Sequence, residues 1–334
     1  MLFPARRRGS RLSTAKRSSR DARSGRGEEA AVSSTEQVLA AGPGALNRPW
    51  RPSWHRHLSG PEFAWAIAFI VPYAAVLVAF AIFPIAYGFW MASSPSLYVQ
   101  LFASDEYWDA VVTTALYVGI GVNTGMFLAL LLSGFFMRRR WWVKAMLVVS
   151  MLPWALPAQT GFISFHWMMV YWGFLNSVLE KLFGIYGPDW LSHYWLALGA
   201  NIVASTWKTM PFWTLILLAG RTAIPQDLYD AADIDGATGF RRFVHLVVPL
   251  LANLYLVCTL LSAIWMIGDF NTPDLVSSGA PVGSTEVLAT LGVAYLFDHG
   301  NPGLGVAVVM TALPVLIPLG ILLIRRLHTR EVQL

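Results

Sequence analysis

The sequence predicts an all-α membrane protein with six transmembrane helices and a disordered, basic N-terminal tail. Its 334 residues are 56% hydrophobic and only 13% charged, and their mean hydropathy is +0.53. The apolar residues fall in long runs rather than in amphipathic stripes, so they fit a bilayer and not water. Basic and acidic residues alternate between the loops that join these runs, which is typical of a multi-pass membrane protein.

Six apolar runs are long enough to cross a bilayer, at roughly 20 residues per crossing. They cover residues 63–91, 110–136, 143–165, 194–219, 247–267 and 304–324. Backbone polar groups find no water inside a bilayer, so each run is expected to form a helix. Pro153 and Pro157 lie inside the third run and are expected to bend it.

The basic residues predict the orientation of the spans. Half of the 24 Lys and Arg residues precede residue 60, and most of the others gather in every second loop, at Arg138, Arg139, Arg140 and Lys144, at Arg221, Arg241 and Arg242, and at Arg325, Arg326 and Arg330. The alternate loops carry acids, at Asp105, Glu106, Asp109, Glu180, Asp189, Asp274, Glu286 and Asp298. Basic loops stay on the cytoplasmic side, so we expect a bacterial inner-membrane protein with both termini cytoplasmic. Lys181 and Lys208 depart from the pattern.

The chain is expected to have two regions, a tail at 1–60 and a six-helix transmembrane domain at 61–334. The tail is rich in Arg, Ser, Gly and Pro and has no apolar run, so it cannot bury enough surface to fold alone. An organellar transit peptide shares the Arg and Ser bias, but Glu28, Glu29 and Glu36 do not suit such a peptide. The net charge of +5 suits contact with anionic lipid head groups, and no feature requires nucleic acid as a partner.

Motifs of soluble enzymes are missing from the sequence. It contains no P-loop, no G-x-S-x-G and no H-E-x-x-H, and its seven His residues are scattered. Gly119 and Gly121 begin like a dinucleotide fingerprint, but they lie in an apolar run, where small residues let helices approach closely. A non-catalytic chain without a cofactor or metal site is therefore predicted.

The loop between the fourth and fifth runs carries the most specific pattern of the chain. Pro225 suits the first turn of a short helix, expected over residues 227–235. In that helix Ala231 and Ala232 would let the surface of another protein come close. Gly236 would allow a sharp turn at the end of the helix.

A second helix, carrying Phe243, is expected after this turn and should end at Pro249. The alternative for the first helix is a solvated acidic surface, because acids recur every three residues at Asp227, Asp230 and Asp233. That alternative explains the acids but not the order in which Ala, Asp and Gly follow one another.

The loop resembles the EAA loop of ABC-importer permeases, through the order Asp230-Ala231-Ala232-Asp233-Ile234-Asp235-Gly236-Ala237, then Phe243 and Pro249. Other segments resemble carbohydrate-uptake permeases of the maltose and glycerol-phosphate type, namely IFPIAY at 82–87, WKTMPF at 207–212, and SGAP with STE at 278–286. The resemblance covers about residues 62–326. Two positions depart from the family pattern, since Asp230 replaces the usual Glu and Ala280 replaces a Gly.

The resemblance implies a type I ABC-importer permease fold and a membrane subunit without enzymatic activity. Its partners would be a second homologous permease, two ATPase subunits that hold ATP and Mg, and an extracellular solute-binding (lipo)protein that delivers a sugar. The helix at 227–235 would couple ATP-driven closure to alternating access about a site near the midplane. The residues implied in coupling are Asp230, Ala231, Ala232, Asp235, Gly236, Ala237 and Phe243.

Polar side chains inside a span are costly and usually face a cavity or a partner helix. Lys208 lies roughly 20 Å from Arg221 along the fourth span, too deep to reach the inner surface. It would face the solute path or form a structural ion pair. In the third span Trp154 and Ala158 are expected to face the same way, and Trp154 adds an aromatic surface.

One face of the fifth span combines aromatic and polar groups, as sugar binding requires, because Ser262, Trp265, Met266 and Asp269 recur at helical spacing. The predicted solute contacts are Trp154, Trp207, Lys208, Ser262, Trp265, Met266 and Asp269. The alternative for Trp residues is the membrane interface belt.

Three other functions stay open. A permease for a sugar phosphate or another polar solute would use Lys208 to meet an anion. A membrane-embedded enzyme would turn over a substrate without ATPase partners. A structural scaffold would tolerate scrambling of the loop at 221–245, which we call the coupling loop after the role that the resemblance implies.

Overall fold

The computed structural model describes residues 61–328, and the predicted tail at 1–60 lies outside them. The chain divides into two units, one up to Val76 and one from Leu77 onward. Helix α2 (Pro61–Leu77) belongs almost entirely to the first unit. Residues 61–328 form helices, turns and loops and contain no strand. This bears out the predicted all-α class.

The second unit contains all the other helices. In chain order these are η1 (Val78–Ile82), α3 (Phe83–Met91), α4 (Pro95–Phe102), α5 (Asp105–Phe136), α6 (Trp141–Ser150), α7 (Leu152–Ala155), α8 (Ala158–Met169), α9 (Phe174–Phe183), α10 (Tyr194–Thr222), α11 (Gln226–Ile234), α12 (Gly239–Arg242), η2 (Phe243–Val247), α13 (Val248–Ile267), η3 (Pro273–Ser277), α14 (Leu288–Phe297), α15 (Pro302–Met310) and α16 (Leu313–His328), where η marks a π-helical turn.

Five stretches of helix are long and apolar enough to cross a membrane, and a bent pair of helices makes a sixth if it counts as one span. They are Ile67–Met91, Asp105–Phe136, Tyr194–Thr222, Gly239–Ile267 and Pro302–Leu327, with the pair Trp141–Ala155 and Ala158–Met169. Every predicted apolar run overlaps one of these stretches. Some helices begin before the run because polar residues suit a first turn, as Asp105 and Glu106 do in α5.

The third span differs from the prediction of one bent helix over 143–165. The stretch Trp141–Ala155, which ends in α7, meets α8 at 95°. Leu156 and Pro157 between them are extended, with ψ of 149° and 134°, because a residue before Pro avoids the helical conformation and Pro has no N–H to continue the ladder. Trp154 and Ala158 therefore lie on separate helices, and the expectation that they share one helical face was wrong.

The second helix of the coupling loop also differs from the prediction, because it does not end at Pro249. The helical stretch Gly239–Ile267 runs through this residue into the fifth span. Pro249 stands in the first turn of α13, directly after the π turn η2. Pro is tolerated in a first turn, and the change in hydrogen-bond pattern at the π turn precedes the position where Pro lacks its donor.

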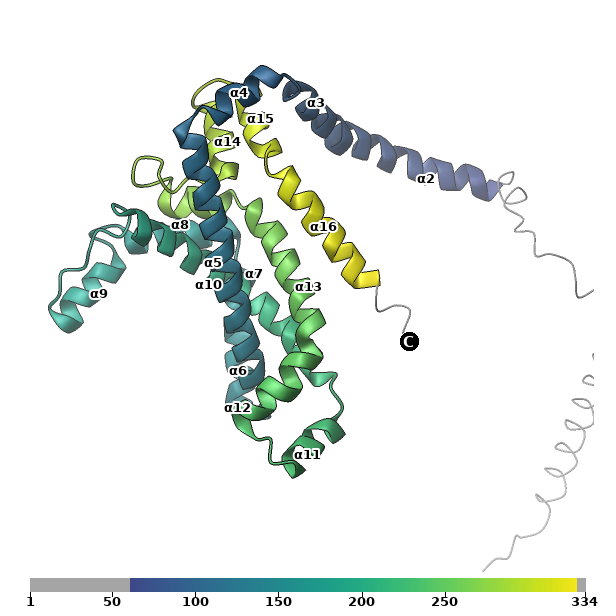
Figure 1. Cartoon of the computed structure of the whole chain (residues 1–334), viewed down its shortest axis with the longest axis vertical. Coiled ribbons are helices and arrows are strands. Elements are labelled where there is room, and N and C mark those ends of the chain that lie inside the picture. Colours follow the sequence, from purple (N-terminus) through teal and green to yellow (C-terminus); the bar gives the residue numbers. More distant parts are fainter. Residues whose placement is uncertain (1–60, 329–334) are drawn as a thin grey trace, which may run out of the picture. The chain divides into compact units, whose positions relative to one another are not determined.

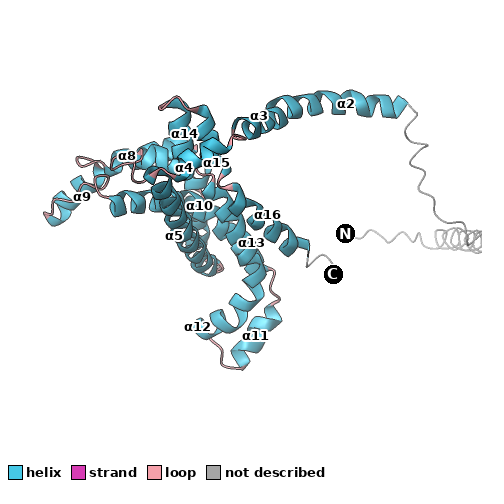
Figure 2. Cartoon of the chain, turned by 45° about the horizontal axis from the view of Figure 1, so that its top comes forward, coloured by secondary structure: helices cyan, strands magenta, loops and turns pink. Residues whose placement is uncertain are grey.

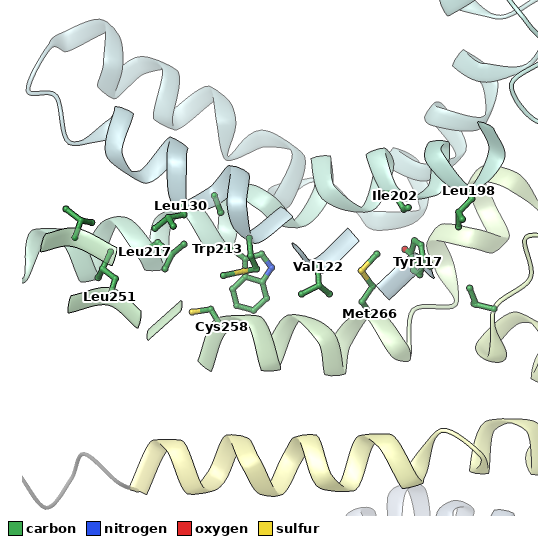
Figure 3. Packing of buried hydrophobic residues seen from close by; sticks show 14 of the residues in the cluster. Tyr117, Val122, Leu130, Leu198, Ile202, Trp213, Leu217, Leu251, Cys258 and Met266 are labelled. Atoms are coloured by element: carbon green, nitrogen blue, oxygen red, sulfur yellow. The ribbon is translucent and has the colours of Figure 1, made fainter. Parts of the chain in front are cut away.

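The main core lies where α5, α10 and α13 pack along one another. Figure 3 shows its side chains in a row between these helices, with Tyr117 and Met266 near one end and Leu130 and Leu251 near the other. Gly121 lets α5 approach α13, since a Cβ at this position would lie 2.3 Å from the Cε atom of Met266. This supports the helix-packing interpretation of Gly121. A Cβ on Gly119 would meet no atom within 4 Å, so close packing does not require that glycine.

The second unit has two chemically distinct ends. Helices α11 and α12 lie at one end of the long helices, and α4, α14 and α15 lie at the other (Figures 1 and 2). We call the first the basic end, which carries Arg138 and Arg242, and the second the acidic end, which carries Glu106 and Glu286. A second core cluster of α4, α5, α14 and α15 residues fills the acidic end.

Candidate functional site

The coupling loop is built on the short helix α11, Gln226–Ile234, which matches the predicted helix at 227–235 to within a residue at each end. The chain leaves it through Gly236, whose φ is +72°. This left-handed conformation favours Gly because a Cβ would crowd the following carbonyl oxygen. Ala237 N donates to the oxygen of Ala232 over 2.8 Å and closes the turn.

The outer surface of this loop is apolar at two prominent positions. Ile234 is 87% exposed and Phe240 is 80% exposed. Asp230, Ala231 and Asp235 are also exposed beside them, whereas Ala232 and Ala237 are half-buried. Ile234 lies outside the spans and Phe240 stands at the start of the fifth. Large apolar side chains exposed there, next to small residues, are typical of a protein-binding surface.

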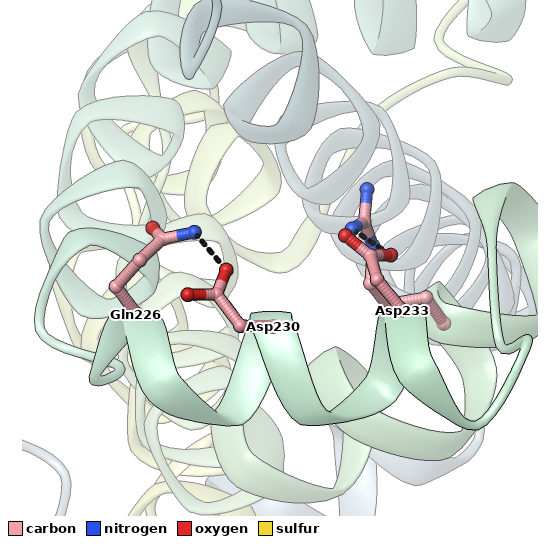
Figure 4. A network of polar contacts seen from close by, with 4 residues as sticks. Gln226, Asp230 and Asp233 are labelled. Carbon is pink, nitrogen blue, oxygen red and sulfur yellow. Dashed lines mark hydrogen bonds and ion pairs between the residues drawn. The ribbon is translucent and has the colours of Figure 1, made fainter.

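Two polar contacts tie the loop together (Figure 4). Gln226 Nε2 donates to Asp230 Oδ1 over 3.0 Å, one turn apart on α11. Arg242 Nη1 lies 2.7 Å from Asp233 Oδ1, which joins the start of the fifth span to α11. The ion pair is therefore made by Asp233 and not by Asp230. Asp230 stands three residues earlier, at the first acidic position of the EAA-like pattern.

Phe243 takes a different place from the other predicted coupling residues. Its ring is half-buried against the main core and lies 5.4 Å from the Cζ atom of Arg221. Arg221 is 5% exposed, and its Nη2 donates to the Leu130 oxygen over 2.8 Å. These contacts join α5, α10 and η2 beneath the loop. Sequence reasoning missed this role of Arg221, because a basic residue at a span end is usually read as an orientation signal.

A cavity of about 280 Å³ lies between α10 and α13, nearer the acidic end. It brings together four of the predicted solute contacts, Ser262, Trp265, Met266 and Asp269. Five further residues complete its lining, namely Ser205, Thr209, Trp213, Gly268 and Asn271. The first three recur every four residues on α10, so helical spacing was the signal that could have found them.

Asp269 is held in a defined orientation in this cavity. The Tyr117 hydroxyl donates to its Oδ2 over 2.7 Å, and the Thr272 backbone N–H donates to its Oδ1 over 3.2 Å. Asp269 therefore links α5 to the end of α13. A carboxylate that is fixed in this way can accept hydrogen bonds from hydroxyl groups without first reorganising.

Aromatic rings continue from the cavity toward the third span. Trp265 stacks on Phe212 at a centroid distance of 5.6 Å, and Phe212 stacks on Trp154 at 5.6 Å. Trp213 contacts both Trp265 and Phe212, at centroid distances of 5.3 Å and 4.9 Å. Trp154 does not line the cavity but is joined to it by this stack, and Trp265 is half exposed. The rings offer flat apolar surfaces beside polar groups.

Trp207 and Lys208 lie outside the lining of this cavity. Trp207 packs on Phe165 of α8, with the ring centroids 5.0 Å apart. Lys208 Nζ donates to the main-chain oxygens of Pro153, Trp154 and Leu156, at 2.9 Å and 3.2 Å for the first two. Both residues therefore contact the broken third span. Within residues 61–328 no carboxylate pairs with Lys208, and a solute-facing role for it stays a prediction.

Comparison with known proteins places this arrangement in a family. Residues 121–330, more than half of the chain, match the family described as "Binding-protein-dependent transport system inner membrane component". The trehalose/maltose transport system permease protein MalF of Thermococcus litoralis is 30% identical over 253 residues, which cover 72% of this chain and 85% of that protein. The sulfoquinovosyl glycerol transport system permease protein SmoG of Agrobacterium fabrum is 30% identical over 288 residues, covering 78% and 90%.

A solved structure has the same fold. It is that of a bacterial alginate ABC transporter in complex with an alginate pentasaccharide-bound periplasmic protein, and one of its chains matches with a TM-score of 0.69 at 17% identity over 84% of this chain and 98% of that one. The matched family region contains the coupling loop, the cavity and the last four spans. The chain belongs to the family of binding-protein-dependent transport system inner membrane components, as a multi-pass, non-catalytic permease.

Proposed function

We propose that this permease carries a sugar, delivered by an extracellular binding protein, through the cavity between α10 and α13. The observation that carries the proposal is the half-exposed ring of Trp265 beside the oriented carboxylate of Asp269 in one cavity, with the buried Trp213 behind that ring. Sugars present apolar ring faces and hydroxyl edges, which aromatic planes and fixed acceptors can bind at once. The trehalose/maltose and sulfoquinovosyl glycerol permeases among the relatives support a carbohydrate.

Coupling to ATP hydrolysis would pass through α11. The exposed Ile234 and Phe240 would dock on an ATPase subunit, which holds ATP and Mg, and Gly236 would set the angle of the helix. Movement of α11 would reach the bundle through the Arg242 to Asp233 ion pair and through Phe243 under Arg221. A second permease would complete the solute path, and two ATPase subunits would serve the pair.

The orientation proposed for the chain puts the basic end in the cytoplasm and the acidic end outside. Arg138, Arg139 and Arg140 and the coupling loop all belong to the basic end. Both termini would then be cytoplasmic in a bacterial inner membrane, as the positive-inside rule requires.

A sugar phosphate is a weaker candidate for the solute. The support for it was Lys208, which was expected to meet an anion. Lys208 does not line the cavity, and its ammonium group donates to three main-chain carbonyl oxygens.

Uptake of radiolabelled trehalose and maltose by cells that express the complete importer tests the proposal. Trp265→Leu and Asp269→Asn should lower uptake per assembled complex, or change the ratio between the two sugars, while basal ATP hydrolysis continues. Trp195→Leu is the matched control, because Trp195 is 66% exposed and lies outside the cavity lining. Loss of assembled complex in proportion to uptake, with the sugar ratio unchanged, would mean that these residues only brace the bundle.

A further inference from the structure

A second and larger cavity lies behind the coupling loop at the basic end. Its volume is about 530 Å³, and α5, α10, α11, α12 and η2 contribute to its walls. It shares no residue with the cavity between α10 and α13. The residues that line it are Gly134, Met137, Arg138, Arg221, Gln226, Tyr229, Gly239, Arg242, Phe243 and Val247.

The charge of this lining is unbalanced. Three of its ten residues are arginines, and none is acidic. Asp233 neutralises Arg242 at 2.7 Å. Arg221 is 5% exposed, and within residues 61–328 no carboxylate oxygen lies within 4.0 Å of its guanidinium nitrogens. A buried charge without a counter-ion is costly, so an anion in the cavity would stabilise this arrangement.

Two of the lining residues also carry buried donors that lack a partner within the described chain. They are Nε of Arg221 and the hydroxyl of Tyr229. The Arg221 guanidinium is held in place on its other side, where Nη2 donates to the Leu130 oxygen over 2.8 Å. Buried polar groups are nearly always hydrogen-bonded in folded proteins. Both atoms are closed to solvent, so an acceptor in the cavity would reach them after a small shift of these side chains.

We propose that this cavity binds a phosphate group. A guanidinium fork matches two phosphate oxygens at once, and a hydroxyl can donate to a third. Basic pockets between transmembrane helices on the cytoplasmic side suit phospholipid head groups, and the volume leaves room for the organic part of the ligand. The group would come from an anionic lipid or from a phosphorylated solute in the cytoplasm. Arg138 follows the end of α5, and Arg242 belongs to α12 of the coupling loop. A phosphate bound by both arginines would therefore connect α5 to the coupling loop.

The test uses the full-length chain in nanodiscs. In the first arm, native mass spectrometry counts the phosphatidylglycerol molecules retained by the chain, with phosphatidylcholine nanodiscs as reference. In the second arm, calorimetry measures the binding of pyrophosphate in phosphatidylcholine nanodiscs. Binding in the first arm alone identifies a lipid head group, and binding in the second shows that a soluble phosphate is accepted. Arg138→Gln and Arg242→Gln should each weaken the binding about tenfold, as the loss of a charge-assisted hydrogen bond does.

Adjacent arginines provide matched controls, because Arg139 and Arg241 do not line the cavity. Arg139→Gln and Arg241→Gln should leave the binding unchanged. Arg138 is exposed and has no part in the Arg242 ion pair, so its variant tests the site even where Arg242→Gln loosens the loop. The proposal is wrong if neither arm detects binding, or if Arg139→Gln acts as strongly as Arg138→Gln. It is also wrong if Arg138→Gln leaves both arms unchanged and instead reduces copurification of the ATPase partner with the complete importer, since a carboxylate of that protein would then fill the cavity.

Discussion

Lys208 Nζ donates a 2.9 Å hydrogen bond to the main-chain oxygen of Pro153, a residue 55 positions earlier in the chain. The residue four positions after Pro153 is Pro157, which has no N–H to offer this oxygen. The ammonium also donates to the oxygens of Trp154 and Leu156. One lysine of the fourth span thus caps the broken end of α7, a role that main-chain donors or a C-terminal cation fill in other helices.

The first prediction concerns this cap. Lys208→Met should lower the thermal unfolding midpoint of the purified complex, because each carbonyl oxygen left unpaired away from water costs about 1–3 kcal/mol. Lys181→Met is the control, since Lys181 is exposed on α9. An unchanged midpoint together with altered solute preference would show that Lys208 is a solute ligand and not a cap.

The second prediction concerns the turn after α11. Gly236→Val should reduce solute-stimulated ATP hydrolysis and uptake per assembled complex, because a side chain in the left-handed conformation costs about 1–2 kcal/mol. Gly236→Asn should lose much less, since Asn tolerates this conformation. Space is not the reason for the effect, as no atom lies within 4 Å of a Cβ added there. Equal activity of the two variants would contradict the turn argument.

The third prediction concerns orientation. In a Cys258→Ala background, a Cys at position 282 should react with an impermeant thiol reagent added to intact cells, and a Cys at position 238 should not. Val282 lies at the acidic end and is fully exposed, and Thr238 is exposed in the coupling loop. Labelling of Thr238→Cys from outside would reverse the proposed topology.

The fourth prediction concerns the pH dependence of the acidic end. Burial raises the pKa of the Glu286 carboxyl, and the nearby Glu106 and Asp298 raise it further, while His299 opposes them. A raised pKa means that the fold favours the protonated acid. The stabilisation is complete below the ordinary glutamate pKa of about 4.3 and is lost as the pH rises through the higher pKa of the folded state.

Glu286→Gln should therefore flatten the fall of the unfolding midpoint as the pH rises above about 4.3. Glu180→Gln changes an exposed position on α9 and should show the same decrease of the unfolding midpoint with pH as the wild-type protein. If the unfolding midpoints of both variants change with pH as that of the wild-type protein does, Glu286 does not cause the pH dependence.

Sequence alone determined the family, the position of helix α11 and the spans apart from the break in the third, because each depends on local information. A bilayer selects apolar runs of a fixed length, and positions 226–236 combine a helix start, small residues and a glycine turn within a dozen residues. The face of α13 was predictable for the same reason. Ser262, Trp265, Met266 and Asp269 share one side of a helix by spacing, and all four line the cavity.

Tertiary structure decided what these faces meet. The sequence marked Lys208 as a costly charge in a span, but only the 95° break between α7 and α8 brings three free carbonyl oxygens to it. Arg221 and Arg138, 83 positions apart, line one cavity only because α10 lies along α5. Hydropathy and spacing show which side of a helix is polar. The partner of a polar group depends instead on packing between segments far apart in the chain, and no local sequence pattern encodes that packing.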